Sequence, residues 1–147
     1  MKKHEFLIVL LICMGLTFIF SSCREIPNCD CDSDPNVIIC ETLKEYEKAP
    51  TDPQMRIESV EMEGDYLKIK FTSGGCSGNT WIEKLIDQGA LLKTNPPQRT
   101  LKLSLDNKEK CKALIHKEVS FNIKCLQVEG SKKVFLNIAG SQILYEY

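Results

Sequence analysis

The chain has 147 residues, of which 27% are charged and 43% hydrophobic, and its formal net charge is −1 at pH 7. This length suits a single globular domain with short extensions. The near-neutral charge and the lack of a basic stripe argue against a nucleic-acid partner. With two histidines, His4 and His116, the chain has few groups for metal binding or general-base chemistry.

The N-terminal residues have the organisation of an export signal. Lys2 and Lys3 precede an uncharged, mostly apolar run of 15 residues from Phe6 to Phe20, and small residues follow at once. A positive start, a short apolar segment and small residues at a cleavage site are typical of a secretory signal. A membrane-spanning helix usually needs about 20 apolar residues, so this run favours a signal that is removed.

The end of that run, Phe20-Ser21-Ser22-Cys23, resembles the lipobox of bacterial lipoproteins. The resemblance implies a type II signal peptide over residues 1–22, cleavage before Cys23 and a diacylglyceryl thioether on the Cys23 thiol. It also implies a place in the bacterial cell envelope, as an outer-membrane lipoprotein held to the membrane by its lipid and facing the periplasm or the surface. The alternatives are a signal-anchor helix with an incidental cysteine and ordinary secretion.

Residues 23–55 have the composition of a polar, cysteine-rich tether. Four prolines interrupt this stretch, at positions 27, 35, 50 and 53. Charged residues at helical spacings between Glu41 and Lys48 predict a short helix of two turns inside it.

Acidic residues in the tether raise the question of a calcium site. Asp30, Asp32, Asp34 and Glu41 occupy positions 1, 3, 5 and 12 of a calcium-binding loop. Pro35 stands at position 6, where such a loop needs glycine, because proline cannot adopt a positive φ. Thiolate ligation by the nearby cysteines is a second metal hypothesis, but an exported compartment favours disulfides. We therefore expect no metal and no cofactor.

From residue 56 onward, apolar and polar residues alternate with a period of two. Strict alternation predicts strands with one buried and one wet face, as in antiparallel sheets. The expected strands are residues 56–62, 67–71, 81–86, 101–105, 119–123, 134–138 and 143–147. About seven short strands over residues 56–147 predict an all-β domain, an antiparallel β-sandwich or a small β-barrel.

Eight cysteines divide into three groups. Cys13 is lost with the signal and Cys23 receives lipid, which leaves an even number to form disulfides. These six are Cys29, Cys31, Cys40, Cys76, Cys111 and Cys125. The favoured pair is Cys76 with Cys111, since both fall at turn-like positions of the β region. The other four are then expected to share the remaining bonds.

Two features could carry recognition or chemistry. The loop from Gly74 to Gly78 resembles a nucleophile loop, and a Cys76 nucleophile with His116 as its base is conceivable. Asn79 breaks the nucleophile-elbow pattern, and a disulfide would silence the thiol, so a stapled glycine turn is favoured. Trp81 and Arg99 are candidates for a recognition patch, because both residue types are enriched at binding hot spots. For Trp81 a place in the core is the favoured interpretation.

Over residues 65–147 the chain resembles small Bacteroidota lipoproteins of unassigned function. The elements that carry this resemblance are Gly75-Cys76-Ser77-Gly78, Trp81, Pro96-Pro97-Gln98-Arg99, Cys111 and Tyr145-Glu146-Tyr147. It implies no activity. The sequence predicts a non-catalytic binding or interaction module for an envelope or extracellular protein or glycan. The alternatives are an inhibitor of a hydrolase such as lysozyme or a protease, a thiol enzyme using Cys76 and His116, and a structural envelope component.

Overall fold

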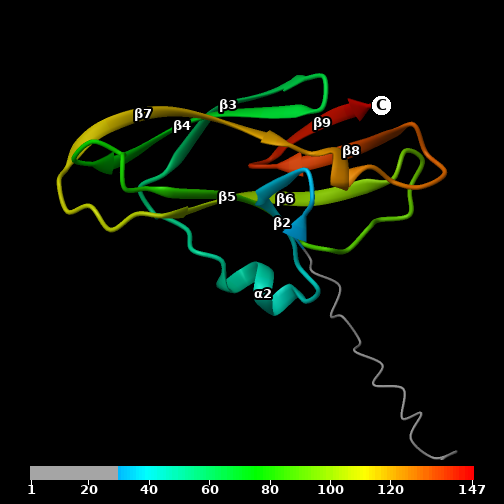
Figure 1. Cartoon of the computed structure of the whole chain (residues 1–147), viewed down its shortest axis with the longest axis horizontal. Helices are drawn as coiled ribbons and strands as arrows, with labels where there is room; N and C mark the ends of the chain where they lie inside the picture. The colour runs from blue at the N-terminus through cyan, green and yellow to red at the C-terminus, as the bar shows by residue number, and fades with distance from the viewer. Residues whose placement is uncertain (1–29) are drawn as a thin grey trace, which may run out of the picture.

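The computed structural model describes residues 30–147, which form two β-sheets packed face to face (Figure 1). The elements are β1 (Asp30–Cys31), β2 (Asp34–Ile39), α2 (Leu43–Lys48), β3 (Arg56–Glu63), β4 (Tyr66–Gly75), β5 (Ile82–Asp87), β6 (Gln98–Asp106), β7 (Ala113–Asn122), η1 (Lys124–Leu126), β8 (Lys133–Ile138) and β9 (Ser141–Glu146). One sheet has the order β1-β2-β5-β6-β8-β9 and the other β3-β4-β7. The fold is an all-β sandwich.

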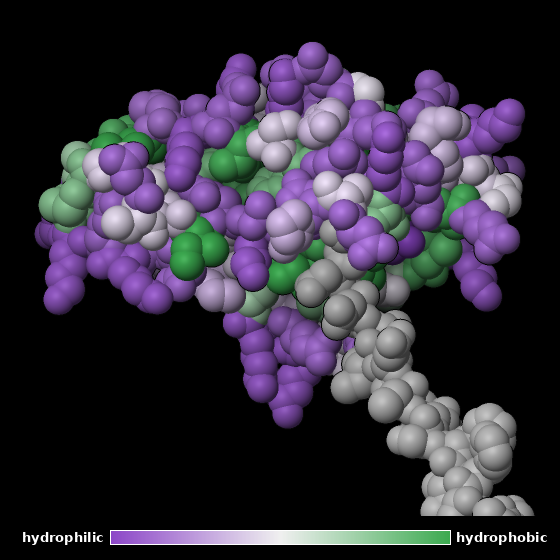
Figure 2. Space-filling model, viewed as in Figure 1, coloured by the Kyte–Doolittle hydropathy of each residue, from purple (hydrophilic) through white to green (hydrophobic). Residues whose placement is uncertain are grey.

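The alternating pattern of the sequence sets the two faces of each sheet. Leu101, Leu103 and Leu105 of β6 are at most 2% exposed. The alternate apolar residues of β8 and β4 are at most 1% exposed, namely Val134, Leu136, Ile138, Leu67, Ile69 and Phe71. The polar residues between them face outward, and Figure 2 shows that hydrophilic residues dominate the surface in this view. Burial of both apolar faces therefore drives the sheets together.

The β8–β9 hairpin fixes the register at one edge of the larger sheet. Its two-residue turn consists of Ala139 and Gly140, with φ of 51° and 79°. Two positive φ values in such a turn match the twist of the flanking strands. Ala139 is the one non-glycine residue with positive φ among residues 30–147. The turn aligns Asn137 with Gln142 across the two strands.

Two strand pairs in the larger sheet are parallel, where the sequence predicted an antiparallel arrangement. β2 runs parallel to β5, and β6 runs parallel to β8. Parallel neighbours need long crossover connections. Local alternation reports which face of a strand is buried but carries no information on the direction of its neighbour.

The expectation of a tether is wrong for residues 34–39, whereas the short helix expected between Glu41 and Lys48 is confirmed. β2 belongs to the larger sheet, with Val37 opposite Leu85 of β5 and fully buried. The short helix α2 follows, capped by reciprocal hydrogen bonds between Thr42 and Glu45. Within residues 30–147, no helix has the length and hydrophobicity needed to cross a membrane.

Helix α2 lies on the outer face of the larger sheet (Figure 1). The Lys102 ammonium of β6 lies over the Tyr46 ring, 4.7 Å from its centroid, and donates to the Ala49 carbonyl at 3.2 Å. Ser104 of β6 donates to the Pro50 carbonyl at 2.7 Å. These contacts attach residues 43–50 to the outer face of the sheet.

Replacing Val37 tests whether β2 is part of the folded domain. Val37→Ala removes two buried methyl groups and leaves a cavity, so the free energy of unfolding should fall by about 2 kcal/mol. Urea denaturation measures the change. Asn36→Ala, at the exposed neighbouring position, should stay within about 0.5 kcal/mol of the parent protein. If Val37→Ala and the parent were equally stable, β2 would not be part of the folded domain and the tether interpretation would hold.

Candidate functional site

A disulfide joins Cys76, just after β4, to Cys111 in the loop between β6 and β7, with their Cα atoms 4.8 Å apart. This is the pair that the sequence favoured. Cys125 is also disulfide-bonded. The structure differs from the sequence prediction at Cys40, whose thiol is free and buried beside the β2–α2 junction. Burial raises the pKa of the Cys40 thiol, which makes it a poor nucleophile and metal ligand.

Glu109 belongs to the same stapled loop and is held by the glycine turn after β4. Its carboxylate accepts hydrogen bonds from the backbone N–H groups of Cys76, Ser77 and Gly78 and from the Thr80 hydroxyl. The hydrogen bond from the Ser77 N–H has the largest effect on the carboxylate. Together with the other three hydrogen bonds it lowers the pKa of Glu109 to about 2. Successive backbone N–H groups around a carboxylate form an anion nest. Here the nest is filled by a side chain of the protein itself.

Glycine is required in this turn because the carboxylate comes so close. A Cβ atom on Gly75 would lie 2.6 Å from Oε2 of Glu109 and 2.7 Å from the Trp81 ring. The turn that resembled a nucleophile loop is thus an internal clamp on the β6–β7 loop.

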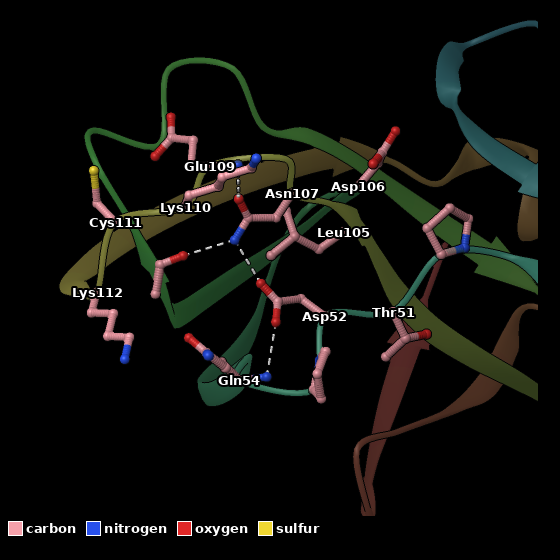
Figure 3. A pocket seen from close by; sticks show the side chains of 13 residues that line it. Thr51, Asp52, Gln54, Leu105, Asp106, Asn107, Glu109, Lys110, Cys111 and Lys112 are labelled. Atoms are coloured by element: carbon pink, nitrogen blue, oxygen red, sulfur yellow. Dashed lines mark hydrogen bonds between the residues drawn. The ribbon is translucent and has the colours of Figure 1, made fainter.

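A cavity of about 420 Å³ opens beside the disulfide, between the β6–β7 loop and residues 50–54 (Figure 3). The Asp52 carboxylate accepts hydrogen bonds from Ser73, Asn107 and the Gln54 backbone at 2.6–2.8 Å. Burial alone would raise the pKa of Asp52, but these hydrogen bonds together lower it. The Asn107 amide also donates to Gly74 and accepts from the Glu109 backbone.

The polar groups at the floor of this cavity are already paired with one another. Asp52, Asn107 and Glu109 use their hydrogen bonds to hold the loop against the glycine turn. The side chains of Lys110 and Lys112 at the rim are exposed, and surface lysines alone do not define a ligand. We therefore assign this cavity a structural role.

A second open groove, of about 410 Å³, lies on the outer face of the larger sheet, over β6, β8 and β9. Tyr46 of α2, the Ala139–Gly140 turn and Ser141 are among the residues that line it. Strand pairing places Thr100, Asn137 and Gln142 side by side on three neighbouring strands. Adjacent strands are about 4.8 Å apart, so these polar side chains form a continuous row along the groove.

Three amide side chains in and beside this groove hold one another. Asn137 donates to Oε1 of Gln98 at 3.1 Å, and Gln142 donates to the same oxygen at 3.2 Å and to Oδ1 of Asn137 at 2.9 Å. We call Gln98, Asn137 and Gln142 the amide triad. The mutual bonds fix the position of each amide before any ligand arrives.

The amide triad keeps unused hydrogen-bonding groups. An amide has two N–H donors and an oxygen that accepts two bonds. After the mutual bonds, two N–H groups of Gln98, one of Asn137 and the oxygen of Gln142 have no protein partner within residues 30–147. The triad thus presents donors and an acceptor from fixed positions, unlike the paired groups beside the disulfide.

Trp81 is a core residue, the interpretation that the sequence favoured, and Arg99 forms no surface patch with it. Trp81 is 5% exposed and packs against Phe71 in the core, with ring centroids 6.0 Å apart. Arg99 forms an ion pair at 3.1 Å with Asp87, which is fully buried, and donates to the Leu126 carbonyl. Both side chains therefore stabilise the interior of the sandwich.

Cys76 and His116 do not form a catalytic pair. The Cys76 sulfur is part of the disulfide, and His116 lies on β7 opposite Thr72, four residues before Cys76 along β4. His116 Nδ1 lies 3.0 Å from Oε1 of Glu58 on the solvent-exposed side of the smaller sheet. The structure therefore removes the basis of the thiol-enzyme alternative.

The calcium hypothesis is wrong for Asp34 and Glu41. Asp34 is the first residue of β2 and Glu41 lies two residues beyond its last residue, Ile39, so the length of the strand, roughly 16 Å at about 3.3 Å per residue, separates them. The Asp34 carboxylate accepts instead from the backbone of Asn36 and Asn122. Among residues 30–147, no group of three or more His, Cys, Asp or Glu side chains is placed to hold a metal. Asp32 is exposed, and the Asp30 side chain lies outside the described part.

Cys23 and Cys29, with the side chain of Cys31, also lie outside the described part, so lipidation and the remaining disulfide pairing stay predictions.

Comparison with known proteins identifies a similar fold. No protein-family model and no curated protein sequence matches the chain. A crystal structure of a protein of unknown function, DUF1344, from Bacteroides vulgatus is similar, with a TM-score of 0.50 and 20% sequence identity. The similarity covers 76% of this chain and 55% of that one, so this chain spans about half of its length. It supports the fold and carries no function.

Replacing Glu109 with glutamine tests the internal clamp through its pH dependence. The carboxylate's pKa is lowered from 4.5 to about 2, so its stabilising effect is complete above pH 4.5 and is lost as the pH falls toward 2. The stability advantage of the parent over Glu109→Gln, measured by urea denaturation, should disappear over that range. The same substitution at Glu47, exposed on α2, should leave the midpoint at neutral pH unchanged. A pH-independent gap would refute the clamp.

Proposed function

We propose that the protein is a lipid-anchored binding module of the bacterial cell envelope, with the groove over β6, β8 and β9 as its ligand site. One observation carries the assignment of the groove: the amide triad is fixed by mutual hydrogen bonds and still has donors and an acceptor available. Preorganised groups bind at a lower entropic cost than mobile ones.

The strand order supports this placement. The lipid would be attached at Cys23, eleven residues before β2 begins at Asp34. β2 lies toward one edge of the larger sheet and β9 forms the other edge. An anchor attached ahead of β2 therefore leaves the groove at the far side of the sheet, accessible to a ligand.

The hydrolase-inhibitor alternative stays a prediction. Its structural support is the β6–β7 loop, which the disulfide and Glu109 hold rigid while Lys108 and Lys110 remain exposed. Rigid loops lose little entropy on docking. The loop has no fixed, unpaired hydrogen-bonding groups like those of the amide triad, so the groove is preferred.

Metabolic labelling with a palmitate analogue tests the anchor. The parent chain should incorporate the label and fractionate with membranes, because two acyl anchors give stable membrane binding. Cys23→Ser should lose the label. Cys13→Ser, within the apolar run, is the matched control and should keep it. Labelling that persists in Cys23→Ser would contradict the placement.

Chemical-shift mapping tests the groove with a mixture of natural small molecules. The ¹⁵N-labelled mature chain, residues 23–147, is mixed with the soluble low-mass fraction of an envelope extract from the bacterium that makes it. Perturbed resonances should cluster at Thr100, Asn137 and Gln142 and should be absent in Asn137→Ala. Perturbations that cluster instead around Asn107 and Lys110, or none at all, would count against the groove.

A further inference from the structure

We infer that the ligand of the groove over β6, β8 and β9 is a neutral saccharide, held by hydrogen bonds from the amide triad. This inference rests on the proposed function and adds the chemical class of the ligand. It follows from the hydrogen-bonding groups, the charge and the lack of apolar pockets in the groove.

The unused groups of the amide triad match hydroxyl groups. A hydroxyl donates one hydrogen bond and accepts two, so a pair of neighbouring hydroxyls needs donors and acceptors close together. Asn137 and Gln142 line the groove, where the free N–H group of Asn137 supplies a donor and the free oxygen of Gln142 supplies an acceptor, while Gln98 beside the groove holds both amides. The hydroxyls of Thr100 and Ser141, which line the same groove, extend this set.

The charge of the groove favours a neutral ligand. Within the described part of the chain, no carboxylate lines it, and Lys102 is its one charged lining residue. The Lys102 ammonium is already bound to the Ala49 carbonyl and lies over the Tyr46 ring. A cationic ligand would find no counter-charge, and an anionic ligand would have to draw Lys102 away from the contacts that attach α2.

The groove offers no pocket for an apolar anchor, which argues against a peptide. Leu101 and Ile138 contribute to its floor, but their side chains are 2% and 1% exposed and pack in the core. Protein partners usually bind through buried aromatic or aliphatic anchors. Tyr46 supplies a single partly exposed aromatic wall, which suits contact with a sugar ring.

The size and openness of the groove set the expected affinity. About 410 Å³ lies within the usual range of roughly 300–1,000 Å³ for small-ligand sites. An open, polar groove buries little apolar surface, so we expect weak binding with a Kd of about 1 mM or somewhat tighter. Such an affinity fits repeated contacts with an oligosaccharide better than retention of a single sugar.

Titration of the ¹⁵N-labelled mature chain with oligosaccharides tests the inference. The neutral arm uses oligomers of glucose, galactose, mannose and N-acetylglucosamine, each up to about 10 mM, ten times the expected Kd. The side-chain amide resonances of Gln98 and Asn137 should shift with at least one of them. The Asn137 amide lines the groove and donates to Gln98, so the two resonances report binding at the triad.

Variants of the triad separate a binding role from a structural one. Asn137→Ala should weaken binding by about tenfold, because it removes one ligand contact and loosens Gln98 and Gln142. Gln142→Glu is nearly isosteric but replaces the donors that hold the triad, so it should weaken binding by a similar factor. Asn36→Ala removes an exposed amide from β2 of the same sheet and should bind like the parent. Thermal denaturation of each variant checks that the fold is retained.

The outcome distinguishes failure of the saccharide from failure of the groove. Two further arms use galacturonic-acid oligomers and a mixture of short peptides. If either one shifts the triad resonances while every neutral oligosaccharide leaves them unmoved, the ligand class is wrong but the groove remains a binding site. If no arm moves them, both the inference and the proposed function fail. Equal binding by Asn137→Ala and the parent would also overturn the inference.

Discussion

The one-sided burial of the strands is the constraint on which the rest of the structure depends. Side chains alternate between the two faces of a strand, so fixing Leu101 and Ile138 in the core sends Thr100 and Asn137 to the outer face. A shift of one residue in β8 would exchange these roles and bury the Asn137 amide. The hydrophobic contact between the sheets therefore fixes the position of the polar row, although no residue of that row takes part in the contact.

Much of the fold follows from this alternation and was predictable from the sequence. The apolar runs at residues 67–71, 101–105 and 134–138 lie within β4, β6 and β8. Residues 34–39 were missed because Pro35 and neighbouring acidic residues resemble a linker, and a single fully buried side chain, Val37, carries little periodic signal. The parallel pairing of β2 with β5 depends on residues almost fifty positions apart, which no local pattern reports.

The candidate site was less accessible to sequence reasoning, for a related reason. Trp81 and Arg99 were chosen by residue type, but residue type does not reveal whether a side chain points inward. Trp81 packs in the core and Arg99 neutralises the buried carboxylate of Asp87. Gln98, Asn137 and Gln142 are ordinary polar residues spread over 45 positions. The alternation did predict that the Asn137 side chain faces outward. Which residues lie beside it depends on the pairing of β8 with β6, which the sequence did not reveal.

The two polar cavities differ in how far their polar side chains are paired with other groups of the protein. Beside the disulfide, every side-chain oxygen and nitrogen of Asp52, Asn107 and Glu109 has at least one partner within the protein, so a ligand that enters competes with bonds that hold the loop. In the amide triad, the internal bonds use some of the hydrogen-bonding groups and leave others without a protein partner among residues 30–147. Complete pairing favours stability, because it leaves no buried group to satisfy. Partial pairing at an exposed site adds little stability, and in the proposal above a ligand replaces the water that completes the hydrogen bonds of the triad.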